Sequence, residues 1–110
     1  MALNEMTACA AATAMREGSI TSEALVEACV ERISAREKAV HAWVDFDGDH
    51  ALAQARAADL ALARGEDCGL LHGVPVGLKD IIDTFDLPTQ SGSRLFSGRR
   101  PAQDGASAAM

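Results

Sequence analysis

The feature that most constrains the fold is a short apolar segment, residues 74–82, which has a proline near its start and a lysine in its second half. A short apolar run between turn-forming residues is typical of a β-strand. Side chains of a strand alternate between two faces, so Lys79 and Gly77 would share one face while Leu78 and Asp80 share the other. We therefore predict a strand over residues 74–82, with Pro75 at its start or edge because proline cannot donate to a ladder.

Lys79 is the unusual residue of this segment. A charged amine on an apolar strand costs desolvation energy unless it is paired, reaches water or loses its proton. A neutral amine could act as a base, and Gly77 would leave room beside it for a ligand or another backbone. The alternation alone favours the simpler explanation, an ammonium group that reaches water or a carboxylate such as that of Asp83.

A longer motif surrounds Lys79. Residues 71–80 read Leu-His-Gly-Val-Pro-Val-Gly-Leu-Lys-Asp, followed by Asp83-Thr84, Leu87-Pro88-Thr89, Gly92-Ser93 and, more loosely, Pro101 and Asp104. In this order the motif resembles the amidase signature family, serine hydrolases that cleave carboxamide bonds. The run from Ile20 to Ile33 and Ala42-Trp43-Val44 resemble the same family, so the likeness spans nearly the whole chain. The resemblance is most specific in the residues that follow Leu70.

The resemblance implies that Lys79 is the catalytic lysine. It would act with two serines, one on a cis peptide bond, in a Gly/Ser-rich segment further along the chain. Ile81 departs from the asparagine common after Lys-Asp in the family, which bears on substrate preference more than on chemistry. No serine of this chain lies in a stretch that resembles Gly-Gly-Ser-Ser-x-Gly and could place a hydroxyl at an oxyanion hole. We therefore expect both serines beyond Met110, and residues 1–110 to be an inactive N-terminal portion of a single amidase domain.

Cap residues and apolar periodicity predict three helices, over about residues 4–17, 22–38 and 50–64. Asn4, Thr21 and Asp47-Gly48-Asp49 supply the start signals, and Gly18 and Gly65 the stop signals. The expected buried stripes are Met6, Cys9, Ala10 and Ala14; Leu25, Ala28, Cys29 and Ile33; and Ala53, Ala57, Leu60 and Ala61.

A second strand is predicted over residues 41–46, with Trp43 packed in the core or on the sheet. The order helix, helix, strand, helix, strand indicates an α/β fold. Together with the resemblance, it predicts the N-terminal part of a large mixed β-sheet flanked by helices. Residues 83–93 would form a loop over the strand's end, where Ser91 and Ser93 either cap the loop, which we favour, or contact a ligand.

The composition excludes several classes of function. The net charge is −6, with 10 basic and 16 acidic residues, and the only basic pair is Arg99-Arg100, so a nucleic-acid-binding surface is not expected. No apolar run approaches the ~20 residues of a membrane helix, and no signal peptide is recognised, so we expect a soluble cytoplasmic protein. Cys9, Cys29 and Cys68 have no metal-ligand spacing, and we predict neither a disulfide, a metal nor a cofactor.

Three functions fit these observations. The first is an amidase that cleaves a small or aryl carboxamide, for which a homodimer is one assembly to test. The second is the amidase-like component of a tRNA-dependent amidotransferase, which resembles the amidases and works with other subunits. The third is a non-catalytic α/β interaction module that keeps the motif as scaffold.

Overall fold

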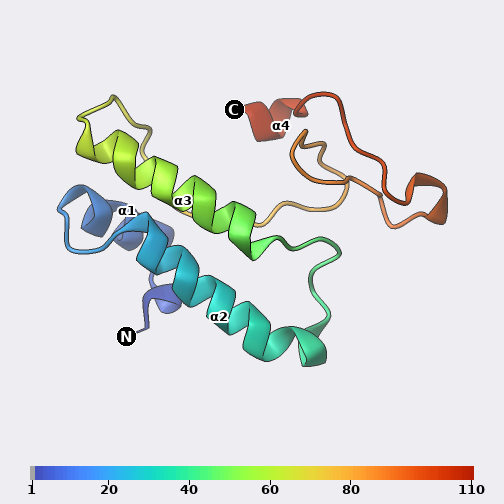
Figure 1. Cartoon of the computed structure of the whole chain (residues 1–110), viewed down its shortest axis with the longest axis horizontal. Coiled ribbons are helices and arrows are strands. Elements are labelled where there is room, and N and C mark those ends of the chain that lie inside the picture. The colour runs from blue at the N-terminus through green and yellow to red at the C-terminus, as the bar shows by residue number, and fades with distance from the viewer. Residues whose placement is uncertain (1) are drawn as a thin grey trace. The chain divides into compact units, whose positions relative to one another are not determined.

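The computed structural model describes residues 2–110, and its elements follow in the order η1 (Leu3–Glu5), α1 (Ala8–Arg16), α2 (Ser22–Val40), α3 (Gly48–Ala63), η2 (Arg94–Phe96) and α4 (Ala106–Ala109) (Figure 1). They belong to two compact units. The first contains the residues up to Ala42 and those from Phe46 to Pro75, and the second contains Trp43–Asp45 and Val76–Met110.

The prediction of an α/β fold is wrong for the part of the chain that is described, because residues 2–110 contain helices and no strand. A strand needs a neighbour to bond its backbone, and neither predicted strand has one. Around residues 74–82, the N–H of Val74 donates to Leu71 O and that of Ile82 to Lys79 O, which are turn contacts. At the start of the other predicted strand, His41 takes a left-handed conformation (φ 51°) and ends α2.

The helix starts are set by side-chain caps. The Oγ1 atoms of Thr7 and Thr21 accept from the N–H groups of Ala10 and Ala24, and the Asp47 carboxylate accepts from the N–H of His50. The prediction of Thr21 as a cap is confirmed. The prediction that Asn4 begins the first helix is wrong, because Leu3–Glu5 form a separate 3₁₀ turn and α1 starts after Thr7.

The core of the first unit consists of Ala11 and Met15 of α1 and Leu25 of α2. Leu3, Met6, Ile20, Cys29, Leu62 and Val74 cover it in part. Figure 1 shows α2 and α3 lying side by side in this unit. No described helix combines the length and the apolar character needed to cross a membrane.

Two of the predicted buried stripes are in the wrong register. In α1 the buried residues are Ala11, Ala12 and Met15, whereas Cys9 and Ala10 are exposed. In α3 only Ala55 is buried, and Leu60 is 56% exposed. Alanine lies on every side of α3, so apolar periodicity could not choose a face.

Candidate functional site

Lys79 lies in the second unit, in an irregular segment, and its side chain is exposed. Its carbonyl oxygen accepts the Ile82 N–H at 2.9 Å, which closes a turn over residues 79–82. The described residues therefore do not give the amine the apolar surroundings expected of a strand. They do leave it accessible to a reacting group.

The side chain of Trp43 lies against Gly77. A Cβ atom built on Gly77 would be 3.2 Å from Cη2 of Trp43. The room expected beside Gly77 for a ligand or another backbone is thus occupied by an indole of the same unit. Trp43 remains 39% exposed, so it covers Gly77 without being a core residue.

Asp80, the residue after Lys79, accepts hydrogen bonds from the backbone of residues 90–92, a corner of the same loop. Its Oδ1 accepts the Gln90 N–H at 2.9 Å, its Oδ2 accepts the Gly92 N–H at 3.4 Å, and its carbonyl oxygen accepts the Ser91 N–H at 2.9 Å. Ser91 (φ 53°) and Gly92 (φ 67°) are both left-handed. We call this set of contacts the Asp80 clamp.

Arg99 pairs with Asp83 in a bidentate ion pair, with Nη1–Oδ1 and Nη2–Oδ2 distances of 2.9 and 3.2 Å. The guanidinium hydrogen bond holds the pKa of Asp83 below its usual value, and the carboxylate raises the pKa of Arg99. The sequence offers Asp83 as a partner for the Lys79 ammonium. In the structure its carboxylate is instead engaged by Arg99.

Further polar contacts hold the rest of this loop. The Asp104 carboxylate accepts the Phe85 N–H at 3.0 Å, and the side-chain oxygen of Gln90 accepts the Gly98 N–H at 3.0 Å. Ser93 Oγ accepts the Leu95 N–H at 3.2 Å and so caps η2, which confirms loop capping for this serine. The unit around Lys79 is organised by side chains that bond backbone, not by a sheet.

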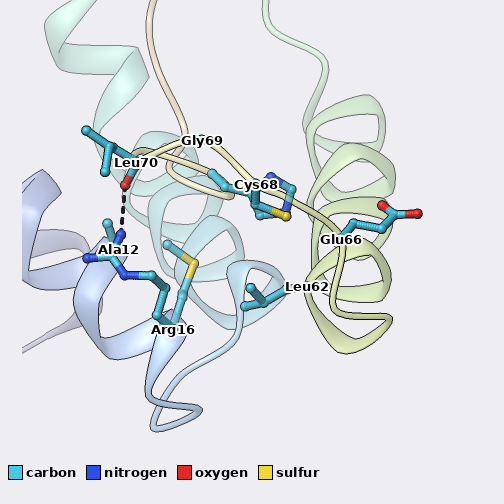
Figure 2. Close-up of a pocket in the computed structure, with 9 residues that line it drawn as sticks. Ala12, Arg16, Leu62, Glu66, Cys68, Gly69 and Leu70 are labelled. Atoms are coloured by element: carbon cyan, nitrogen blue, oxygen red, sulfur yellow. Dashed lines mark hydrogen bonds between the residues drawn. The ribbon is translucent and has the colours of Figure 1, made fainter.

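A separate pocket of about 170 Å³ lies in the first unit, lined by Ala12, Met15, Arg16, Leu62, Glu66, Cys68, Gly69, Leu70 and His72 (Figure 2). Of these lining residues, Arg16 donates from Nη1 to Leu70 O at 3.2 Å, the bond that is dashed in Figure 2. His72 Nε2 lies 2.7 Å from Ala58 O and therefore carries its proton there. Sequence reasoning missed this pocket, because it joins residues of α1 and α3 with the loop that follows α3.

The three cysteines are free thiols. The prediction that Cys9 is buried is wrong, since its side chain is exposed, while partial burial raises the pKa of the Cys29 thiol. Within the described residues, no group of three or more His, Cys, Asp or Glu side chains could hold a metal ion.

Comparison of the sequence with known proteins shows the family of the chain. The family model named Amidase matches residues 24–110, a range that includes Lys79 and the Asp80 clamp. The A subunit of glutamyl-tRNA(Gln) amidotransferase from Chloroflexus aurantiacus is 43% identical over 99 residues, which cover 90% of this chain and 20% of that protein. The corresponding protein of Streptomyces coelicolor is 42% identical over 100 residues, 91% of this chain and 20% of that protein.

A protein of Mycobacterium bovis, provisionally named amidase AmiD, is 40% identical over 90 residues, 82% of this chain and 19% of that protein. The chain spans about a fifth of the length of these relatives. The match of the family model over most of the chain, with the Lys79 motif inside it, shows that the chain belongs to the amidase signature family.

Proposed function

We propose that this chain is the lysine-bearing, N-terminal portion of an enzyme that hydrolyses a carboxamide C–N bond, and that Lys79 is its catalytic base. The observation that carries the proposal is the family match over residues 24–110, which contains the whole motif around Lys79. The names of the relatives, an amidotransferase and an amidase, both describe chemistry at an amide.

The chemistry assigns a clear role to the amine. A serine hydroxyl must lose a proton to attack the amide carbonyl, and the leaving amine must gain one. A neutral Lys79 would take the first proton and return it, directly or through the second serine. The two serines would follow residue 110. Lys79 is exposed, so its amine is open to a hydroxyl brought from elsewhere in the protein, and the apolar surroundings that favour a neutral amine would have to come from the same source.

The chain has only two lysines, which provides a matched control. In the protein from the complete reading frame, we expect Lys79→Ala to lower kcat for ammonia release from simple amides by about 10³-fold, within the range of general-base effects. Lys38→Ala, at an exposed position in the last turn of α2, should leave kcat within about twofold. Full activity of Lys79→Ala would refute the role of Lys79 as the base, whereas a wild type without activity on any amide would favour the non-catalytic module.

The same assay applied to residues 1–110 alone tests where the nucleophile lies. We expect no turnover of an aryl amide. Turnover that is abolished by Lys79→Ala would show that a serine of this chain is sufficient, and it would overturn the assignment of both serines to later residues.

A second candidate is the amidase-like component of a tRNA-dependent amidotransferase, and the names of the relatives from Chloroflexus and Streptomyces favour it. This function requires other subunits, whereas an amidase would act alone or as a homodimer. Ammonia release from glutamine that depends on co-expression of the neighbouring reading frames would support the amidotransferase. Equal rates without them would support the amidase. The single-domain organisation and the cytoplasmic location stay predictions from the sequence.

A further inference from the structure

We propose that Asp80 is a positioning residue for Lys79, an inference that rests on the proposed function and deepens it. Its carboxylate joins the turn that carries Lys79 to the corner at residues 90–92 and thereby fixes the direction in which the lysine leaves the backbone. Asp80 does not itself contact a reacting group in this assignment.

The contacts of Asp80 support a holding role. Both carboxylate oxygens accept backbone N–H groups, from Gln90 and Gly92, and the carbonyl oxygen accepts a third, from Ser91. All three donors come from consecutive residues ten or more positions away. A carboxylate that accepts backbone N–H groups makes charge-assisted bonds, which are stronger than bonds between neutral groups.

The corner that Asp80 holds is strained. Ser91 is a non-glycine residue in the left-handed region (φ 53°), and Gly92 follows with φ 67°. Such a conformation persists only where its surroundings enforce it. The described contacts of the Ser91 and Gly92 backbone N–H groups go to Asp80.

Lys79 depends on this framework because little else fixes its segment. Its side chain is exposed, and the turn at 79–82 is closed by a single backbone bond from Ile82. Trp43 covers Gly77, two residues before Lys79, and the Asp80 clamp holds the residue that follows Lys79. Misplacing a catalytic group by about 1 Å can lower a rate about 100-fold. Loss of the clamp should therefore appear in kcat rather than in substrate binding.

The test compares Asp80→Ala with Asp104→Ala in the protein from the complete reading frame. Asp104 makes a bond of the same type to the Phe85 N–H, so the control removes a similar contact of the same loop. We expect Asp80→Ala to lower kcat about 100-fold with KM changed less than about threefold. Asp104→Ala should keep kcat within about twofold of the wild type.

Two further readouts separate positioning from unfolding. Asp80→Asn keeps one acceptor oxygen, and it should recover at least about tenfold of the lost kcat. Hydrogen exchange of the Gln90 amide should speed up about tenfold in Asp80→Ala and stay unchanged in Asp104→Ala. Equal kcat values for the two alanine variants, or unchanged exchange at Gln90, would overturn the inference.

A failure of the proposed function can be told apart from a failure of the positioning role. If the wild type releases no ammonia from any amide, or if Lys79→Ala is fully active, the catalytic proposal fails and the positioning role fails with it. The exchange experiment then still decides whether the Asp80 clamp exists in solution.

Discussion

At the scale of single residues, Gly73 of the motif lies close against side chains of α1 and α2. Its φ is +80°, and a Cβ atom there would lie 3.0 Å from Met15 Sδ and 3.1 Å from Ser22 Cβ. Ser22, only 2% exposed, donates its hydroxyl to Gly73 O at 2.6 Å. Both the backbone angle and the lack of space therefore require glycine.

Replacing Gly73 by alanine should accordingly be costly. We expect a loss of about 2–4 kcal/mol, from the left-handed backbone and from overpacking against Met15 and Ser22. Gly18→Ala is the matched control, because Gly18 has φ +77° but nothing within 4 Å of its Cβ position. It should lose only about 1–2 kcal/mol. The opening free energy of α2 from hydrogen exchange measures both, and equal losses would contradict the packing argument.

The ion pair of Asp83 and Arg99 predicts a response to acid. Because Arg99 lowers the pKa of Asp83, its stabilising effect is present above the carboxyl's ordinary value of 3.8 and is lost as pH falls through the lower folded value. The protection of the backbone amides of residues 82–99 against hydrogen exchange should therefore decrease as the pH falls below 3.8. In Asp83→Asn this part of the pH dependence should be missing. An unchanged pH profile in the variant would show that the ion pair contributes nothing.

At the scale of elements, the N-terminus of α2 is capped by a residue of α3 in addition to its own N-cap residue, Thr21. The Asp59 carboxylate, on α3, accepts the N–H of Ser22 at 2.7 Å and that of Glu23 at 3.0 Å. Negative charge at a helix N-terminus also interacts favourably with the helix dipole. Arg56, one turn earlier on α3, pairs with Glu23 at 2.6 Å. These contacts fix the rotation of α3 against α2.

Asp59→Ala should therefore loosen the contact between the two helices. We expect a loss of about 1–3 kcal/mol, because two N–H groups at a half-buried helix start lose a charged acceptor. Asp67→Ala changes an exposed loop carboxylate and should stay within about 0.5 kcal/mol. Exchange rates of the amides at the start of α2 report the difference. A similar small effect of both variants would refute the role of Asp59 as a cap.

Local signals were enough to find several helix ends, although not the start of α1, but they did not show which faces the helices bury. Thr21, Gly18 and Gly65 start or end a helix through contacts and backbone angles within one turn of their own positions. The structure confirms all three predictions. The register of α3 depends on Asp59 reaching α2, which no local pattern shows. The predicted strands failed for a similar reason, since backbone pairing requires a partner segment that the described residues do not supply.

At the scale of the molecule, the chain exposes many large apolar side chains and buries few. Among residues 2–110, the hydrophobic side chains that are buried are those of Ala11, Ala12, Met15, Leu25, Val26 and Ala55. By contrast, Leu95 is 90% exposed, Leu70 83% and Val76 73%. Apolar side chains that are exposed to this degree often mark contacts with other parts of a protein or a tendency to aggregate.

We therefore expect residues 1–110, purified alone, to fold poorly or aggregate. Thermal denaturation followed by circular dichroism should be broad, and the dye ANS should bind at neutral pH. The protein from the complete reading frame, measured under the same conditions, is the control. A sharp cooperative transition of a monomeric 110-residue chain, without ANS binding, would contradict this expectation.

The sequence by itself determined the family, the motif that contains Lys79 and most helix caps. Motif order and capping depend on residues that are close together in the chain. Only the tertiary structure decided that Trp43 covers Gly77, that Asp83 pairs with Arg99, and that Asp80 holds residues 90–92. These contacts join residues ten or more positions apart, so no local pattern could reveal them. The lysine was readable from the sequence, whereas the framework that holds it became visible only in the fold.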